Sequence, residues 1–407
     1  MFTRSGLATF ALILTVAGYP LTAIVAELLV GADLGRIFTI PYRAIVVLVS
    51  LVLVLFVPVG PGRMRHTAFW VCWWSFWFLY ICRMLTDTLI MPVDLRLPIS
   101  EYFLYGIGTT FIPAIGMAAA ARNFDEERTP QALLVAAALG SLLALFYILL
   151  TREIADIDAA AASRFGSAML NPISLGHVGA STIILAGWWL IFGGGSRPML
   201  ERISLFVVIG IGLAAVVLSS SRGPVIALAA SAAMLFMAQR MFFVPLIVAG
   251  GLAALLAVFH SVSDTPFLVV ERISTAAFDD STRTMLLRQG WHAFANSPLI
   301  GAGIDPLSSY PHNLIVEAFM ANGFVSGILF TFLFVASLRV SYKMAAASPT
   351  RSWLPALYVQ YATAVMFSGN IYGSNIFWGL MAAVVAWSAV AHIDSDKAPA
   401  SNRGATL

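Results

Sequence analysis

The sequence is poor in charged residues and in lysine, and each shortage excludes a class of protein. Asp, Glu, Lys and Arg make up only 11% of the chain, whereas soluble domains hold about a quarter. Hydrophobic residues make up 60%, so a soluble globular domain is excluded and lipid is the expected solvent. Lys343 and Lys397 are the only lysines, so arginine supplies nearly all the positive charge and a general nucleic-acid surface is not indicated.

Cysteine is scarce too, because Cys72 and Cys82 are the only two and both lie in one apolar run. Neither a disulfide framework nor a metal site is indicated by such a pair. We expect both side chains in the protein core. The sequence shows no metal-ligand cluster, nucleotide-binding loop or serine-hydrolase elbow, so no metal and no cofactor are predicted.

Long apolar runs dominate what is present, and a run of about 20 apolar residues crosses a bilayer at ~1.5 Å per residue. The expected fold class is all-α, a polytopic membrane helix bundle of about 12 transmembrane helices over residues 1–393, with a polar cytoplasmic tail at 394–407. The first run is longer than a signal peptide core and is expected to stay as an anchor. The predicted spans are 7–30, 37–58, 67–90, 101–121, 131–150, 174–193, 204–218, 224–238, 241–260, 313–338, 353–369 and 375–392.

The loops between these spans predict the orientation. With the N-terminus inside, thirteen Lys and Arg residues fall in cytoplasmic segments and eight in outer segments, which fits the positive-inside rule. Both termini are then cytoplasmic. The one long hydrophilic excursion, 261–312, is then a periplasmic loop, which we expect to contain short helices and the chemistry of the protein.

A polar turn, Ser219-Ser220-Ser221-Arg222-Gly223-Pro224, precedes the eighth span. Serine suits a helix N-cap and proline suits the first helical turn. Free N–H groups beside Ser221 and Arg222 would therefore suit a phosphate. A capped turn whose arginine reaches lipid headgroups is the alternative.

A second candidate site, Pro311-His312-Asn313, begins the tenth span. His312 suits proton transfer near neutral pH or a hydrogen bond to a phosphate oxygen, and a capping or interfacial histidine is the alternative. Glu317 lies one turn further into the membrane, where a carboxylate is costly without a partner. We expect Glu317 to orient Asn313, His312 or a loop arginine.

The segment from Ser281 to Asn296 has the periodicity of an amphipathic helix. Arg283 falls on its apolar stripe and Arg288 falls on the opposite face, where a solvated charge is ordinary. Arg283 is therefore the preferred site residue and Arg288 the second choice. The stripe consists of Leu287, Trp291 and Phe294.

Polar residues elsewhere carry weaker signals. Arg164 is a further outer cation and a candidate substrate contact, although an ordinary loop arginine is the alternative. Arg83 and Asp87 are four residues apart in the third span and are expected to pair with each other. His177 is expected to be a satisfied helix histidine.

These pieces, in this order, resemble the O-antigen ligase and polymerase family. The turn at 219–223 is similar to the family's Ser-Arg-Gly turn, and the stretches 282–287 and 296–303 are similar to its outer loop. His312-Asn313-Leu314, Glu317 and the stretch 322–327 continue the match. The resemblance covers about 160–340. Leu287 departs from it, because the family often has an aromatic residue there.

The resemblance implies a metal-independent glycosyltransferase of lipopolysaccharide or polysaccharide biosynthesis. It would move a glycan from an undecaprenyl-diphosphate carrier to a hydroxyl of lipid A-core or of a carrier-linked glycan, at the periplasmic face of the bacterial inner membrane. Arg222, Arg283 and His312 match the family's functional residues and are the predicted catalytic residues. The predicted substrate-binding residues are Arg288, Arg164, Asn313, Glu317 and Ser221.

Two alternatives stay open at this stage. The motifs are shared by ligases and polymerases, and they do not separate a basic from a phosphate-positioning role for His312. A transporter or lipid-linked glycan flippase is the alternative from another class, because polar residues inside spans also suit a translocation path. A transporter should hold its charges near the midplane, whereas here they gather at the outer ends, which favours an enzyme.

The topology predicts that a cysteine placed at Ser281 reacts with a membrane-impermeant maleimide added from the periplasmic side. The reason is that the charge bias of the loops places 261–312 outside the cytoplasm. Labelling in intact spheroplasts and in inverted vesicles measures this. Reaction from the cytoplasmic side alone would overturn the orientation.

Overall fold

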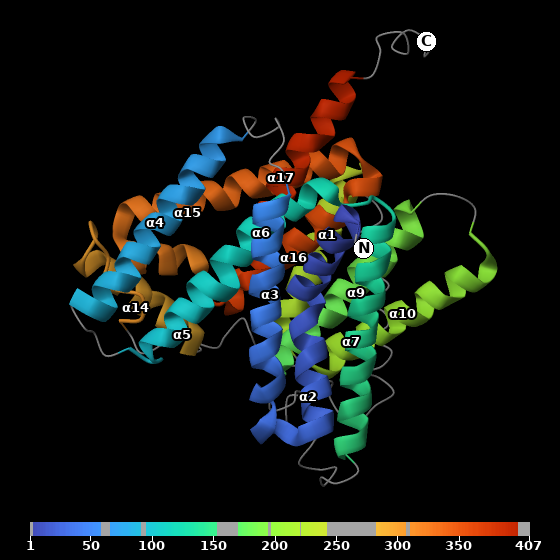
Figure 1. Cartoon of the computed structure of the whole chain (residues 1–407), viewed down its shortest axis with the longest axis horizontal. Coiled ribbons are helices and arrows are strands. Elements are labelled where there is room, and N and C mark those ends of the chain that lie inside the picture. Colours follow the sequence, from blue (N-terminus) through green and yellow to red (C-terminus); the bar gives the residue numbers. More distant parts are fainter. Residues whose placement is uncertain are drawn as a thin grey trace.

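The computed structural model describes residues 3–57, 66–90, 95–152, 170–193, 197–219, 221–241, 282–306 and 310–397. Within these ranges all regular structure is helical, and the helices form a single assembly (Figure 1). The predicted all-α fold class is therefore confirmed.

Three of the apolar spans of the first half contain a π-helical segment, which lies inside two of them and ends the third. π-Helical turns are rare and occur often at functional sites. The elements in chain order are α1 (Arg4–Ile13), η1 (Leu14–Gly18, π), α2 (Tyr19–Leu34), α3 (Arg36–Phe56), α4 (Thr67–Leu85), η3 (Thr86–Ile90, π), α5 (Ile99–Phe103), η4 (Leu104–Phe111, π), α6 (Ile112–Ala120), η5 (Ala121–Asn123) and α7 (Arg128–Arg152).

The second half adds the helices that carry most of the predicted site. The helix predicted over Ser281 to Asn296 is present as α14. The elements are α9 (Pro172–Phe192), α10 (Met199–Leu218), α11 (Arg222–Ala238), α14 (Thr282–Asn296), α15 (Leu314–Ala347), η6 (Pro349–Arg351), α16 (Trp353–Ser368) and α17 (Asn375–Lys397).

Eight helices in the described ranges are long and apolar enough to cross a membrane. They coincide with eight predicted spans, so a polytopic membrane protein is confirmed. Three further predicted spans are helical, but α11 and the apolar part of α17 are shorter, and α16 does not reach the required length. The span 241–260 lies almost wholly outside the described residues, so the count of about twelve stays a prediction. The predicted tail begins inside α17, which continues to Lys397.

Aromatic side chains of α4 pack against the C-terminal helices and form the centre of the core. The Trp77 ring lies 4.9 Å from the Trp378 ring of α17, and the Phe76 ring lies 5.5 Å from the Phe330 ring of α15. All four side chains are fully buried. The expectation of two core cysteines is wrong for Cys82, which is exposed, because α4 turns that face away from its helical neighbours.

The predicted tenth span is not one continuous helix. Gly323 interrupts α15 with φ 75°, a conformation that favours glycine. The segment 297–302 packs into the break, where the Phe324 N–H donates to the Pro298 carbonyl at 2.8 Å and the Ala302 N–H donates to the Met320 carbonyl at 2.7 Å. The short helical piece 314–322 is thus set apart from the long piece 324–347.

The same segment is fastened to α4 by the Arg83–Asp87 pair. The pair is formed as predicted, with Arg83 Nε 2.8 Å from Asp87 Oδ1. Arg83 also donates to the Ile300 carbonyl at 3.0 Å, and Asp87 accepts the Ile304 N–H at 2.8 Å. The chain from Ile300 to Ile304 therefore has a fixed position beside the core.

Replacing Gly323 with alanine should lower thermal stability, by about 1–3 kcal/mol in free energy of unfolding. A Cβ atom at Gly323 would collide with the Leu299 carbonyl as well as strain the backbone. Thermal unfolding of the purified protein in detergent measures this. Gly187→Ala is the matched control, since nothing lies within 4 Å of a Cβ atom there. Equal stability of the two variants would mean that the break tolerates a side chain.

Candidate functional site

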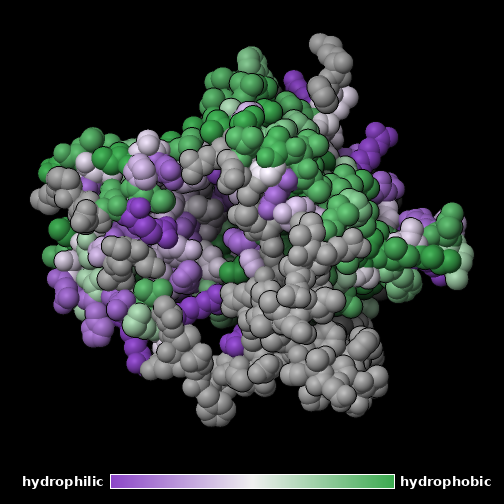
Figure 2. Space-filling model, turned by 90° about the horizontal axis from the view of Figure 1, so that it is seen from below, coloured by the Kyte–Doolittle hydropathy of each residue, from purple (hydrophilic) through white to green (hydrophobic). Residues whose placement is uncertain are grey.

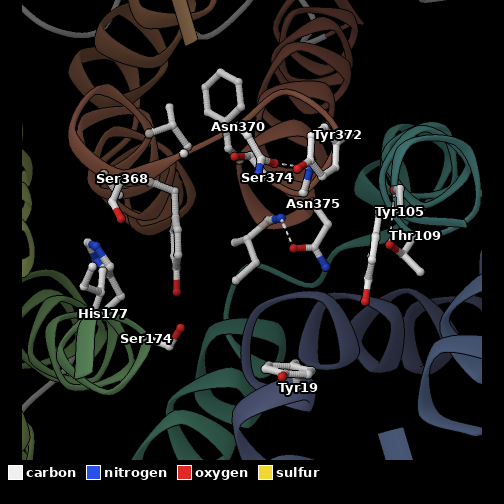
Figure 3. A pocket seen from close by; sticks show the side chains of 18 of the residues that line it. Tyr19, Tyr105, Thr109, Ser174, His177, Ser368, Asn370, Tyr372, Ser374 and Asn375 are labelled. Carbon is white, nitrogen blue, oxygen red and sulfur yellow. Dashed lines mark hydrogen bonds between the residues drawn. The ribbon is translucent and has the colours of Figure 1, made fainter. Parts of the chain in front are cut away.

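A cavity of about 610 Å³ lies among the helix ends that these contacts fix. Its walls come from α2, α3, η4, the start of α9, the connection between α16 and α17, and the segments around Arg283 and His312. Figure 3 shows Tyr19 of α2, Tyr105 of η4, His177 of α9 and Asn375 at the start of α17 around one space. In Figure 2 hydrophilic residues gather around a hollow of the described surface, while hydrophobic residues predominate along its upper edge.

The charge of the cavity wall is positive. Arg43, Arg96 and Arg283 line it, and none of the described lining residues is an aspartate or glutamate. Like charges gathered in a partly buried space repel one another, and a bound anion removes that repulsion. The wall therefore favours an anionic ligand.

Two helix N-termini reinforce this preference. Asn171 caps α9 by accepting the Ser174 N–H at 2.8 Å, and both residues line the cavity. The first residues of α17, from Asn375 to Phe377, line it as well. The N-terminus of an α-helix carries about half a positive charge. Helix dipoles and arginines thus act in the same direction.

Arg96 is held in place by three side chains. Its Nη2 donates to the Tyr372 hydroxyl at 2.7 Å, its Nε lies 3.6 Å from Asp305 Oδ2, and its guanidinium lies 5.2 Å from the centre of the Tyr310 ring. Asp305 is 1% exposed and accepts the Tyr102 hydroxyl at 2.6 Å. Arg96 is therefore a preorganised donor, because its orientation is set before a ligand arrives.

His312 has an uncommon backbone conformation at the cavity edge. Its φ is 55°, in the left-handed region, which costs a residue with a Cβ atom about 1 kcal/mol or more. Its ring lies 4.3 Å from the Tyr310 ring. Burial lowers the pKa of His312 below its ordinary value, and the charges of Arg283 and Arg96 lower it further. The ring is therefore neutral at pH 7 and able to accept a proton.

Two of the three predicted catalytic residues, Arg283 and His312, line this cavity. Arg222 begins α11 in a turn that lies against α9, where a Cβ atom at Gly223 would be 4.0 Å from His177 Nε2. His177 itself lines the cavity. The Ser-Arg-Gly turn thus lies behind a residue of the wall, and Arg222 is not among the described residues that line it.

Three predicted substrate-binding residues form hydrogen bonds with backbone groups in this structure. Asn313 caps α15, accepting the Ile315 and Val316 N–H groups at 3.1 and 3.2 Å. Glu317 is fully buried and accepts the Ile371 N–H at 3.0 Å, which orients the connection between α16 and α17. Ser221 Oγ donates to the Ser219 carbonyl at 3.1 Å. Asn313 and Glu317 thus hold segments next to cavity-lining residues, whereas Ser221 holds the turn behind the wall.

The structure does not place the remaining two predicted substrate-binding residues, Arg288 and Arg164, at the cavity. Arg288 is exposed on α14 and is not among the described lining residues. Arg164 lies outside the described residues. The aromatic residues Trp291 and Phe294 of α14 pack on Phe319 at 5.5 and 5.2 Å, so the predicted stripe faces α15.

Sequence reasoning missed two arginines of the wall. Arg43 lies inside a predicted span, and an arginine inside a span is by itself a functional signal that was available. Arg96 was counted as an outer cation, but nothing in the sequence pairs it with Asp305, 209 positions away. The tyrosines of the wall had no sequence signal, since interfacial tyrosine is ordinary in membrane proteins.

The helices and the cavity together define a polytopic membrane protein with a cationic site for an anion. The O-antigen ligase family model matches residues 205–331. This match confirms the resemblance seen in the sequence and supports the O-antigen ligase and polymerase family for this chain, which implies a glycosyl-transferring membrane enzyme. A search of curated proteins finds no match. Within the described residues no group of three or more His, Cys, Asp or Glu side chains is placed to hold a metal ion.

The geometry predicts that Arg283→Gln raises the pKa of His312, because one of the two cations that disfavour the charged ring is removed. The burial contribution should persist. Histidine ring NMR of labelled protein in detergent, assigned with a His312→Gln variant, measures the titration. Arg288→Gln is the control and should leave the pKa unchanged. Equal pKa values of His312 in the unsubstituted protein and both variants would mean that the charge of Arg283 does not act on His312.

Proposed function

We propose that this protein transfers a glycan from an undecaprenyl-diphosphate carrier to an acceptor hydroxyl at the periplasmic face of the bacterial inner membrane. The single observation that carries this proposal is the shared cavity of Arg283 and His312. Both residues come from the stretch that matches the O-antigen ligase family, and Arg43 and Arg96 line the same space. A diphosphate is an anion of matching chemistry.

The reaction needs stabilisation of negative charge at the leaving group. The acceptor oxygen forms a bond to the anomeric carbon, and the bond from that carbon to the diphosphate oxygen breaks with its electron pair. Negative charge grows on the diphosphate, where fixed guanidinium groups and helix N-termini stabilise it. Arg283 and Arg96 would bind phosphate oxygens, and Arg222 would act through the turn behind His177.

The acceptor proton must leave as the new bond forms. A neutral His312 either takes this proton or donates a hydrogen bond that positions a phosphate oxygen, in which case a phosphate oxygen takes the proton. The low pKa of His312 supports the neutral form in both cases. Asn313 and Glu317 would keep His312 and the connection between α16 and α17 in place.

The topology of the wall supports the proposed periplasmic side. The residues of α3, α9 and α17 that line the cavity lie in the N-terminal halves of those helices, as Tyr105 and Thr109 do in the span Ile99–Asn123. With alternating spans and an internal N-terminus, these parts lie toward the outer side, and Thr15 and Tyr19 extend the cavity to the middle of the first span. The site thus gathers at one face, as an enzyme that meets lipid-linked substrates there requires.

The acceptor is lipid A-core for a ligase and another carrier-linked glycan for a polymerase, and the shared cavity suits both. A transporter or flippase is the second candidate function. It predicts charges near the midplane, whereas the three arginines of the wall lie toward one end.

Arg283→Lys should reduce glycan transfer about a hundredfold or more while leaving the protein folded and inserted. Lysine keeps the charge but loses the planar fork that binds two phosphate oxygens at once. Membranes supplied with carrier-linked glycan and a chelator, followed to ligated or polymerised product, measure the rate.

The matched control is Arg288→Lys, on the same helix but away from the cavity, which should cost much less. A dead Arg288 variant beside a normal Arg283 variant would reassign the site to the other helix face. Normal transfer by both variants and by His312→Ala would contradict the proposed catalytic site and favour the transporter.

A further inference from the structure

A second hollow of about 390 Å³ lies along one face of α3. Its wall is almost entirely apolar and follows one helical face, because its residues recur at intervals of three and four. Leu104, the first residue of η4, forms the opposite wall. We call this hollow the α3 groove; on α3 it is lined by Ile40, Arg43, Ala44, Val47, Leu48 and Leu51.

Arg43 lines both the α3 groove and the cationic cavity. Its guanidinium lies 4.9 Å from the centre of the Tyr105 ring. Tyr105 lines the cavity, whereas its chain neighbour Leu104 lines the groove. The seam between α3 and η4 therefore has an apolar outer side and a polar inner side, and the Arg43–Tyr105 contact crosses it.

We propose that the α3 groove holds the polyprenyl chain of the lipid-linked donor next to its diphosphate, with Arg43 binding the diphosphate where the chain enters the cavity. This inference rests on the proposed function. One molecule with an anionic head and an apolar chain satisfies both sides of the seam at once. Arg43 is the residue that joins the two sides.

The groove positions the chain and adds little affinity. A polyprenyl chain leaves one apolar medium, the bilayer, for another, so no hydrophobic gain drives it into the groove. The binding free energy must come from the charged head at Arg43 and in the cavity. Phosphatidylcholine, whose zwitterionic head carries no net charge, should therefore compete poorly for the groove.

Photocrosslinking tests this occupant directly. The full chain carries photoreactive p-benzoylphenylalanine in place of Ala44, in phosphatidylcholine nanodiscs that contain undecaprenyl diphosphate, and intact-mass spectrometry identifies the adducts. Ile45 is the matched control position, because it is the next residue, is similarly exposed to lipid and does not line the groove. We expect at least fivefold more undecaprenyl-diphosphate adduct at position 44 than at position 45.

A second variant tests the link between head and chain. Arg43→Gln should reduce the undecaprenyl-diphosphate adduct at position 44 at least fivefold, while the phosphatidylcholine adduct at position 45 stays unchanged and reports correct insertion. Phosphatidylcholine adducts alone at position 44, equal undecaprenyl-diphosphate adducts at both positions, or indifference to Arg43→Gln would each overturn the inference.

This readout is separate from the transfer assay. Adducts at position 44 without glycan transfer would keep the groove and remove the proposed function. Transfer with only phosphatidylcholine at position 44 would keep the function and remove the groove.

Discussion

The break in α15 at Gly323 is the constraint on which the site depends. Because the helix is interrupted there, its N–H and C=O groups are available to the segment 297–302, which packs into the gap. The segment then carries Asp305 to the back of Arg96, while the short helix 314–322 brings Glu317 to the connection between α16 and α17. The orientation of Arg96 and one wall of the cavity both follow from this packing.

Three buried carboxylates near the site each have a partner for at least one oxygen, although Asp305 Oδ1 and Glu317 Oε2 have none. Asp87 pairs with Arg83, Asp305 accepts from Tyr102 and lies beside Arg96, and Glu317 accepts a backbone N–H. None of these carboxylates lines the cavity, whereas Arg43, Arg96 and Arg283 do. The described wall of the cavity is therefore positive.

The predicted site was partly found from local patterns. Arg283 and His312 were identified because each lies on a short motif whose periodicity or capping can be seen along the chain. Arg96 was missed because its role comes from Asp305 and Tyr372, which are remote in sequence. Arg43 was missed although an arginine inside a span is a signal of function. Asn313 and Glu317 were predicted to bind substrate; the fold shows their contacts with the backbone, and a role in binding stays a prediction.

The sequence by itself determined that this is a polytopic helical membrane protein, where most spans lie, and that α14 is an amphipathic helix. Hydropathy and helical periodicity are local properties, and a lipid solvent leaves helices as the main way to satisfy backbone polar groups. Only the tertiary structure decided that α15 breaks at Gly323, which arginines share a cavity and that Arg43 also borders an apolar groove. These features depend on which helix ends meet, and helix packing in lipid is set by side-chain shape and polar contacts between segments remote in sequence.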